Sequence, residues 1–368
     1  MTARVLEVLG QSAGGVGRHV ARVTSSLDGI AGLHIDIAAP SDIRVAMPKK
    51  VVPLEVPTGA LVGHRRTIRA LASIVDRGGY EVVHAHGLRA GIDAALALRS
   101  RRVRFLYTVH NVIHPQVSGR LRASVYGRAE PLPVRMSDTT FAASEEIARN
   151  ILRRAPDARA KVEVLRLGVG ELPAPTLGRV GVRRALGVGD EQPLVVTVAR
   201  LAPQKALHVL IEALALLPEE VVLVLIGDGP LEGRLRSLAR ARGVAERALF
   251  LGYRDDIVDH VAAADVFCLS SVWEAVALAA QEAVQLGIPV VSTDVGGMGE
   301  LIEDGVSGRL VPPGDPRALA RAIAGVLADR TRARAYTVAA SATLTERFST
   351  AAMLIRLERA YLEGEDAG

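Results

Sequence analysis

The sequence predicts an α/β protein of two domains, each built on a doubly wound parallel sheet. Three observations predict this class. The chain has 368 residues, more than one hydrophobic core usually serves. Short apolar runs alternate with longer helical stretches along most of the chain, which is typical of parallel strands joined by helices. A Gly- and Pro-rich stretch, residues 168–181, interrupts this alternation and has the character of a linker.

Six strands are expected before the linker, since six runs are short, rich in aliphatic and β-branched residues, and bounded by turn residues. They are residues 4–10, 33–39, 80–86, 103–110, 138–144 and 161–167. Helices are expected between several of these strands, at residues 16–27, 65–76 and 145–154. This order places helices on both faces of one parallel sheet.

The same alternation restarts after the linker. The further runs expected to be strands are PLVVTVAR, EVVLVLIGDG, ALFLG, ADVFCLSS, IPVVSTD and GRLVPP. Helical stretches separate them, so a second doubly wound sheet is expected. Ligands of such sheets bind beyond the carboxyl ends of the strands, and the loops that follow these strands are therefore where a site is expected.

The composition is that of a soluble globular protein, with 49% hydrophobic and 23% charged residues. The lone cysteine, Cys268, lies in an apolar run and is expected to be a buried strand residue rather than a nucleophile. A single cysteine excludes a disulfide within the chain and fits a reducing compartment. The sequence shows no signal peptide and no run of the roughly 20 apolar residues that span a bilayer. We therefore expect a cytoplasmic protein.

The charge is distributed unequally between the two halves. Residues 1–170 carry 25 Lys and Arg against 14 Asp and Glu, whereas residues 171–368 carry 20 against 26. A basic first half fits an anionic membrane surface, an anionic acceptor or nucleic acid. Aromatic residues make up only 3% of the chain, which leaves little material for stacking on bases. We therefore expect no nucleic-acid partner. We expect peripheral contact with the inner face of the plasma membrane. An arginine-rich surface without any partner explains the excess of positive charge equally well.

A glycine-rich turn follows the first expected strand. Gly14, Gly15 and Gly17 fall between that strand and the next helix, where bare backbone can approach a phosphate. The spacing G-G-x-G differs from the dinucleotide fingerprint G-x-G-x-x-G, and Asp36 lies inside the second strand rather than after it. This argues against a nicotinamide-dependent oxidoreductase. A purely structural turn remains as good an interpretation as a phosphate site.

Four histidines stand at or just after the ends of expected strands: His84, His86, His110 and His114. Such a group suggests zinc, but no cysteine or carboxylate accompanies it in the sequence. We expect the rings of the two histidines in HAH to point to opposite faces of their strand, and therefore expect no metal site. His110, next to the polar Asn111, is placed to hydrogen-bond a hydroxylated substrate.

Two cations follow the first strand of the second half. Arg200 ends that strand, and Lys205 comes five residues later at the head of a helix. Cations that converge on a helix N-terminus make a site for a dianionic group such as a diphosphate. Ordinary surface cations are the alternative, but these two are the only Lys or Arg between Arg184 and Arg234.

Two glutamates, Glu274 and Glu282, lie eight positions apart in an otherwise apolar stretch. A helix is expected to begin near Ala275, which would put the second glutamate two turns into it. At 100° per residue, the two would differ by about 80° in direction and would line one cleft at two depths. The outer carboxylate would accept hydrogen bonds from sugar hydroxyls and the inner one from the paired hydroxyls of a ribose. Alternatively, Glu274 is only a first-turn helix acid.

Taken in order, these motifs resemble a known family. G-G-x-G, HAHG, TVHN, VARLAPQK, IGDGP, Glu-x7-Glu and GIPVVSTDVGGMGELIEDG are similar to motifs of the retaining, nucleotide-sugar-dependent glycosyltransferases of family 4. The resemblance extends from residue 4 to about residue 330. It implies the GT-B fold, in which two Rossmann-like domains face a cleft. Residues 1–170, joined by a last helix at about 350–368, would receive the acceptor, and residues 171–349 would hold the nucleotide-sugar donor.

The resemblance also implies residue roles. Arg200 and Lys205 would hold the donor diphosphate and stabilise the leaving group. Glu282 would bind the ribose, Glu274 would position the donor sugar, and His110 would lie beside the transferred sugar. The remaining donor contacts that it implies are Gly15, Gly17, Ala277 and Leu278.

The reaction that the resemblance implies needs no metal and no cofactor. The donor would be a UDP-, GDP- or ADP-sugar, and the acceptor a hydroxyl group on a lipid-linked molecule or a cell-envelope polymer. The acceptor would attack from the side of the leaving group, and the departing phosphate would take its proton.

Three departures from the family pattern stand out. The family commonly has Glu-Gly-Phe-Gly where this chain has EAVA, so Ala275 and Ala277 would strain the loop if either position needed a positive φ. Ala206 replaces a usual glycine, and the linker motif is reduced to LGVG. A non-catalytic nucleotide-sugar-binding homologue and a two-domain sugar-nucleotide epimerase are therefore kept as alternatives to the transferase.

Overall fold

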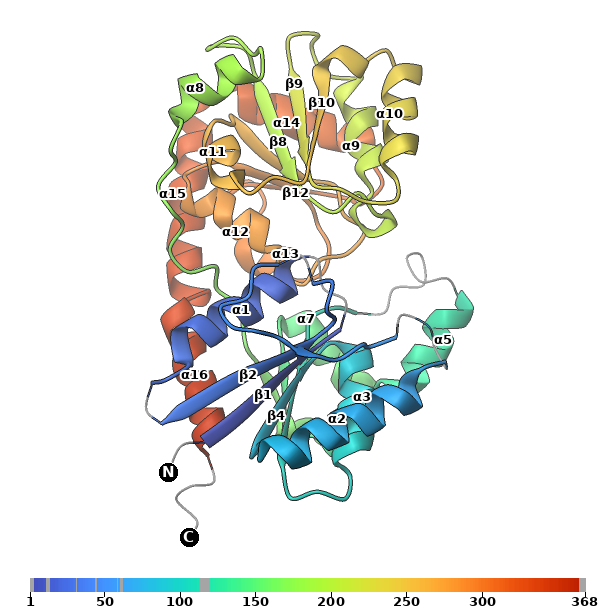
Figure 1. The fold of residues 1–368 in the computed structure, drawn as a ribbon. Coiled ribbons are helices and arrows are strands. Elements are labelled where there is room, and N and C mark those ends of the chain that lie inside the picture. The colour runs from blue at the N-terminus through green and yellow to red at the C-terminus, as the bar shows by residue number, and fades with distance from the viewer. Residues whose placement is uncertain are drawn as a thin grey trace. The chain divides into compact units, whose positions relative to one another are not determined.

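The computed structural model describes residues 3–10, 14–30, 32–43, 45–57, 59, 62–112 and 120–363. The chain divides into two compact units (Figure 1). Unit 1 comprises Met1–Leu167 together with Thr350–Gly368, and unit 2 comprises Gly168–Ser349. The division falls where the Gly- and Pro-rich stretch begins.

Unit 1 is built on a seven-stranded parallel sheet with the strand order β3-β2-β1-β4-β5-β6-β7. Its strands are β1 (Ala3–Leu9), β2 (Leu33–Ala39), β3 (Val52–Pro53), β4 (Val82–His86), β5 (Arg104–Val109), β6 (Thr139–Ala142) and β7 (Val162–Val164). All six strands expected from the sequence are present. Their ends lie within two residues of the expected ones, except that β7 ends three residues earlier than expected. The two-residue strand β3 was not expected, because a run this short carries no periodicity.

Helices cover both faces of this sheet (Figure 1). On one face, α1 packs against α16, and α16 also contacts β1; on the other, α3 packs against α2. Ser144 begins α7 by accepting the N–H of Ile147, and Glu145 and Glu146 complement the helix dipole in its first turn. The helices are α1 (Gly15–Leu27), α2 (His64–Gly78), α3 (Leu88–Leu98), α5 (Arg120–Ala129), α6 (Pro131–Met136), α7 (Glu145–Arg154) and α16 (Thr350–Leu362).

Unit 2 is built on a six-stranded parallel sheet with the order β10-β9-β8-β11-β12-β13. Its strands are β8 (Leu194–Val198), β9 (Val222–Ile226), β10 (Ala248–Gly252), β11 (Val266–Leu269), β12 (Val290–Thr293) and β13 (Arg309–Val311). The helices are α8 (Gly178–Ala185), α9 (Leu207–Leu214), α10 (Glu232–Ala241), α11 (Ile257–Ala262), α12 (Leu278–Gln285), α13 (Met298–Leu301), α14 (Pro316–Ala328) and α15 (Arg330–Arg347).

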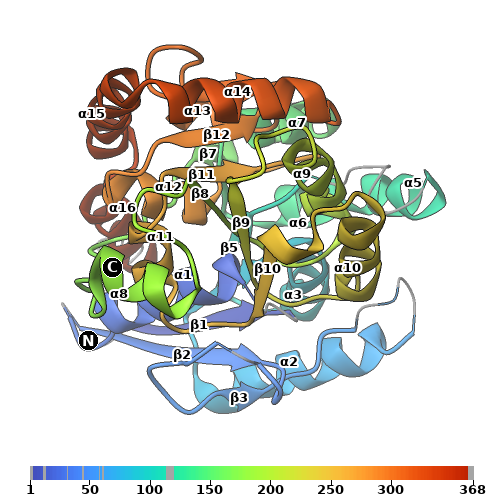
Figure 2. The same ribbon diagram turned by 90° about the horizontal axis from the view of Figure 1, so that it is seen from above.

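The sheet of unit 2 is buried on both faces. Alternate residues of β8 join two different cores: Val195 packs with residues of α9, α10 and α14, and Val196 packs with residues of α8, α11 and α12 (Figure 2). Both sides of each strand must therefore be apolar, which explains the continuous apolar runs in the sequence. Cys268 is a buried, free cysteine on β11, as expected. The predicted class of two doubly wound parallel sheets is confirmed.

Each sheet reverses its direction of winding at one place. In unit 1 the chain moves outward from β1 through β2 to β3 and then returns to place β4 on the other side of β1. In unit 2 the corresponding neighbours are β8 and β11. Loops after such a strand pair diverge and leave a crevice, which is where doubly wound sheets bind ligands. Among the residues that the structure describes, no helix is long and apolar enough to cross a membrane.

Candidate active site

Lys205 and Glu274 meet at the switch point of unit 2, where β8 and β11 are neighbours. The Lys205 Nζ atom lies 2.5 Å from Glu274 Oε1, and the Ser271 hydroxyl donates to the same oxygen at 2.5 Å. The side chain of Glu274 is 7% exposed, whereas that of Lys205 is 21% exposed. The lysine therefore neutralises a buried carboxylate and still reaches solvent, where its other N–H groups can meet an anion.

The backbone holds the Glu274 loop tightly in place. The N–H of Gly297 donates to the Glu274 carbonyl at 3.1 Å. Gly296 has a φ of +61°, and a Cβ atom there would lie 1.6 Å from the same carbonyl oxygen. The Gln204 side chain also donates to the carbonyl of Trp273 at 3.0 Å. The glycine pair after β12 is thus what allows the loop that carries Glu274 to pack at this place.

Arg200 follows β8 and is exposed. The loop IGDGP packs closely against the backbone on either side of it. A Cβ atom on Gly227, which has a φ of +127°, would lie 2.2 Å from the carbonyl oxygen of Ala199. One on Gly229 would lie 2.4 Å from that of Leu201. The Arg200 side chain forms no hydrogen bond or ion pair with any residue that the structure describes, so its backbone is fixed while its guanidinium is available to a ligand.

Glu282 lies on α12 and is 6% exposed. The helix begins at Leu278 and not near Ala275, so the expected depth of two turns was wrong: Glu282 is the fifth residue of the helix. The expected angle between the two glutamates does not apply either, because Glu274 belongs to the preceding loop. Ala277 is the N-cap of α12, and no side chain caps this end of the helix. The methyl group of Ala277 cannot accept a hydrogen bond from the first backbone N–H groups of α12, as a Ser or Asp cap would.

The EAVA segment does not have the strained backbone that we expected, and another residue does. Neither Ala275 nor Ala277 has a positive φ, and Ala277 has a φ of −65°. Among the non-glycine residues described, only Ala206 has a positive φ, at +42°. A left-handed conformation costs an L-residue about 1–2 kcal/mol. The strain therefore sits directly after Lys205, where the family resemblance expects a glycine.

A buried polar cluster lies in unit 1. Glu7, on β1, is fully buried, and its Oε2 is 2.5 Å from His86 Nε2. The Tyr361 hydroxyl donates to the other carboxylate oxygen at 2.5 Å. Burial would raise the pKa of the Glu7 carboxyl, but the neighbouring His84 and His86 lower it well below its usual range. Because Tyr361 is on α16, the cluster also joins the C-terminal helix to the first strand.

The arrangement of His84 and His86 contradicts the sequence-based expectation. Their rings lie on the same face of β4, with centroids 4.2 Å apart, since residues two apart on a strand share a face. With Glu7 they place three ligand atoms within 4.8 Å of one another, a spacing that a metal ion could use. The nitrogens of His84 are, however, already engaged by the hydroxyls of Tyr361, at 2.9 Å, and Thr108, at 2.7 Å. Hydrogen bonding accounts for this group as it stands.

His110 directly follows β5 and belongs to the same cluster. Its Nε2 lies 2.9 Å from Nδ1 of His86, and the residue is 5% exposed. The ring of His19, on α1, is centred 5.8 Å away. Nδ1 of His110 and both nitrogens of His19 are buried without a hydrogen-bond partner among the described residues. Burial lowers the pKa of His19 to about 3. It also lowers the pKa of His86, and it lowers that of His110 well below its usual range.

The remaining predicted positions are placed as follows. Gly15 is the first residue of α1 and Gly17 lies in its first turn, so the Gly15 N–H is at the helix N-terminus. Their phosphate contacts stay predictions. His114 falls outside the described residues. His110 and the two glycines belong to unit 1, whereas the other predicted site residues belong to unit 2.

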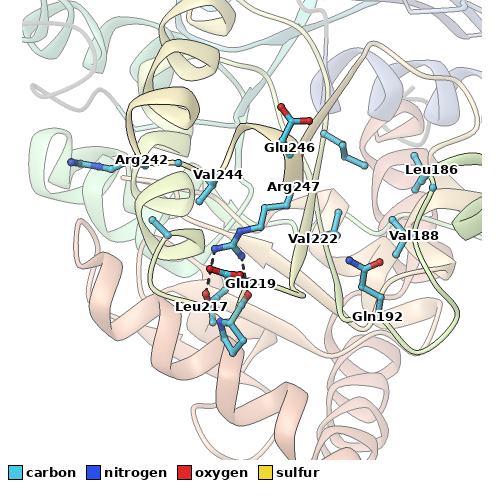
Figure 3. Close-up of a pocket in the computed structure, with 15 residues that line it drawn as sticks. Leu186, Val188, Gln192, Leu217, Glu219, Val222, Arg242, Val244, Glu246 and Arg247 are labelled. Carbon is cyan, nitrogen blue, oxygen red and sulfur yellow. Dashed lines mark hydrogen bonds between the residues drawn. The ribbon is translucent and has the colours of Figure 1, made fainter.

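A hollow of about 750 Å³ lies at the other end of the unit 2 sheet, near the starts of β9 and β10 (Figure 3). Its central charged residue, Arg247, donates to the backbone carbonyls of Leu214, Leu217, Pro218 and Val221. These bonds tie the two terminal nitrogens of Arg247 to the end of α9 and to the segment that follows it. None of the predicted site residues lines it, and we assign it a structural role.

Sequence reasoning missed several members of the two sites: Glu7, His19, Tyr361, Ser271 and Gly296. Glu7 carries a readable signal, since it is a carboxylate in the middle of the apolar run RVLEVL. The same signal singled out Glu282. Tyr361 offers no such signal, because it is 354 residues from the carboxylate that it contacts.

Two family models and several known proteins match this chain. The family model described as Glycosyltransferase Family 4 matches residues 13–170, and that described as Glycosyl transferases group 1 matches residues 182–342. A D-inositol 3-phosphate glycosyltransferase of Xylanimonas cellulosilytica is 33% identical over 300 residues, covering 75% of this chain and 71% of that protein. The lipopolysaccharide core biosynthesis glycosyltransferase LpsE of Rhizobium meliloti is 38% identical over 175 residues, covering 47% of this chain and 51% of that protein.

Solved structures share the fold. The Anabaena protein Alr3699/HepE, in complex with UDP and glucose, matches with a TM-score of 0.82 at 22% identity, over 97% of this chain and 99% of that one. WaaG, a glycosyltransferase involved in lipopolysaccharide biosynthesis, matches with a TM-score of 0.78 at 18% identity, over 98% of this chain and all (100%) of that one.

Proposed function

Because this chain belongs to the glycosyltransferases of family 4, we propose that it moves a sugar from a nucleoside diphosphate to a hydroxyl acceptor with retention of configuration. The observation that carries this proposal is the Lys205–Glu274 pair at the switch point of unit 2, with the unengaged guanidinium of Arg200 on the same loop. Two cations in the loop after a strand at the switch point suit a ligand group that carries two negative charges.

The chemistry of the leaving group follows from these charges. As the bond between the sugar C1 and the phosphate oxygen breaks, negative charge grows on the departing diphosphate. Lys205 and Arg200 stabilise that charge without a metal ion, in a site partly screened from water. The acceptor oxygen bonds to C1 on the same face, and its proton passes to the departing phosphate oxygen.

We assign Glu282 to the ribose of the donor. Its carboxylate is almost fully buried on α12, and an ionised carboxylate can accept hydrogen bonds from two adjacent hydroxyls. The uncapped N–H groups at Ala277 and Leu278 suit the diphosphate. The complexes of HepE with UDP and with UDP-glucose support a UDP-sugar, and GDP- and ADP-sugars complete the candidate donors.

A thermal-shift screen tests the donor assignment. One nucleotide sugar among UDP-, GDP- and ADP-sugars is expected to raise Tm, because a ligand at 100 times its Kd stabilises the folded state by about 2.7 kcal/mol. Glu282→Gln is expected to reduce that shift, whereas Glu303→Gln, at an exposed position of the same unit, should leave it unchanged. A rise in Tm with NAD or NADP and none with any sugar nucleotide would overturn the proposal.

The non-catalytic alternative has lost its main support. It rested on the alanines of EAVA, and neither takes the positive φ that would strain them. A binding protein of this kind would pass the thermal-shift screen but would release no nucleoside diphosphate with any acceptor. An epimerase would convert one nucleotide sugar into its epimer, with no net release of nucleoside diphosphate and no glycoside formed.

We also propose that α2 makes peripheral contact with an anionic membrane surface and so brings a lipid-linked acceptor to unit 1. The arginine side chains of unit 1 differ in whether they form hydrogen bonds or ion pairs with other described residues. Arg101 is paired with Asp76, at 2.7 Å, and Arg104 donates to the carbonyl of Tyr361. By contrast, the side chains of three exposed arginines on α2 have no partner among the described residues: Arg65, Arg66 and Arg69.

Co-sedimentation with vesicles checks the membrane contact. Binding is expected to strengthen as the fraction of anionic lipid rises, because each arginine near an anionic surface contributes about 1 kcal/mol of binding free energy. The triple variant Arg65→Gln, Arg66→Gln, Arg69→Gln should lose most of it, whereas Arg101→Gln, at an engaged position, should not. Binding that does not depend on anionic lipid would count against the proposal.

A further inference from the structure

The buried cluster of unit 1 allows its protons to be assigned, starting from Glu7. Its carboxyl is ionised, so both oxygens can only accept hydrogen bonds. The Tyr361 hydroxyl gives its single proton to Oε1. Oε2 lies 2.5 Å from His86 Nε2, and this nitrogen must therefore carry a proton and donate it.

The next steps follow along the chain of rings. A neutral imidazole has one N–H, so His86, protonated at Nε2, has a bare Nδ1 that accepts. The atom facing this Nδ1 at 2.9 Å is Nε2 of His110, which must donate. Burial lowers the pKa of both rings, which keeps them neutral. Nδ1 of His110 is then bare and can only accept.

The other branch of the cluster is consistent with this assignment. Because Tyr361 has given its proton to Glu7, its oxygen accepts from Nδ1 of His84 at 2.9 Å. The second nitrogen of His84 is 2.7 Å from the Thr108 hydroxyl, which can donate to it. Every short contact in the cluster is thus matched by one donor and one acceptor.

The bare nitrogen of His110 calls for a ligand. It is buried and has no partner among the described residues, and both nitrogens of the nearby His19 are in the same condition. A buried polar atom without a hydrogen bond costs roughly 1–3 kcal/mol and is uncommon in native structures. A ligand that supplies a donor to His110 would remove this penalty.

We infer that Glu7, acting through His86, holds His110 in the tautomer whose Nδ1 accepts, so that the substrate group bound there must be a hydrogen-bond donor such as a sugar hydroxyl. A deprotonated phosphate oxygen or a carbonyl oxygen has no proton to give and is rejected. Glu7 and His86 are positioning residues, since they act on the substrate through His110. The identity of the donor group as a sugar hydroxyl rests on the proposed function, whereas the tautomer does not.

Nitrogen-15 NMR of the full chain, labelled at histidine, tests the inference. His110→Gln and His86→Gln assign the signals of the two rings. The wild-type spectrum is expected to show both rings as Nε2–H tautomers. If His110 proves to be the Nδ1–H tautomer or a charged ring, the inference is wrong, and this result needs no variant of Glu7 that folds.

Glu7→Gln then tests the cause. A glutamine side chain has an NH₂ group that donates as well as an oxygen that accepts. If the NH₂ group faces His86, the tautomers of His86 and His110 must both change. If it faces Tyr361, the tautomer of His84 must change. One branch therefore has to change tautomer, and no change in any of the three rings would overturn the relay. The matched control is Glu163→Gln: this carboxylate also bonds α16, through Arg356 at 2.7 Å, but lies outside the cluster and should leave all tautomers unaltered.

Addition of the nucleotide sugar that raises Tm tests the identity of the group bound at His110 separately from the tautomer of that ring. A shift of the His110 Nδ1 signal without a change of tautomer supports a hydroxyl at this atom. If the nucleotide sugar binds and does not shift that signal, the hydroxyl assignment is overturned while the tautomer stands. If no nucleotide sugar binds at all, the proposed function fails, and the tautomer result is unaffected.

Discussion

Lys205→Ala is expected to lower kcat by two to three orders of magnitude, the loss typical when one group that stabilises a developing negative charge is removed. The ammonium of Lys205 is the only one within ion-pair distance of Glu274 among the described residues. Turnover is measured as release of nucleoside diphosphate, with the donor found by thermal shift. Full activity of the variant would contradict the assignment of Lys205 to the donor diphosphate.

This substitution also leaves the Glu274 carboxylate buried without its cation, which can destabilise a protein by about 3–5 kcal/mol. The double variant Lys205→Ala, Glu274→Gln removes that buried charge and separates the two effects. We expect it to recover most of the lost Tm and none of the lost turnover. Recovery of activity along with stability would show that Lys205 acts on the fold and not on the leaving group.

Gly296→Ala is expected to reduce donor binding and turnover by at least tenfold and to lower Tm. Its Cβ would lie 1.6 Å from the carbonyl oxygen of Glu274, so the loop that presents this glutamate has to move. A displacement of this kind, by about 1 Å, can cost on the order of 100-fold in rate.

The matched control is Gly314→Ala. This glycine has a φ of +76°, close to the +61° of Gly296, but a Cβ there meets nothing within 4 Å. It should therefore show only the cost of placing alanine in a left-handed conformation, about 1–2 kcal/mol, with unchanged turnover. Equal losses in the two variants would mean that the backbone conformation, and not the contact with Glu274, explains the effect.

Much of the fold and of the unit 2 site could be predicted because the signals are local. Arg200 and Lys205 stand out in a long stretch without other cations, and both lie in the loop after β8. The start of α12 was misplaced for a tertiary reason. Alanines favour a helix from Ala275, but Lys205, Ser271 and the N–H of Gly297 hold Glu274 outside it, and the helix is delayed to Leu278.

The unit 1 cluster shows what sequence alone does not reveal. His84 and His86 lie on one face of β4, as the two-residue period of a strand dictates, and not on the opposite faces that we expected. The contact of Tyr361 with Glu7 was not predictable, because it depends on the return of α16 to β1 across 354 residues.

Calorimetric titration of wild type and Arg200→Ala with the preferred nucleoside diphosphate and its monophosphate tests the central claim most directly. If the loop after β8 holds a diphosphate, the wild type binds the diphosphate more tightly. Arg200→Ala then loses about tenfold or more of that preference while keeping its affinity for the monophosphate, since one charge-assisted hydrogen bond contributes roughly 1.5–3 kcal/mol. Glu303→Gln should match the wild type. An unchanged preference in Arg200→Ala would contradict the account.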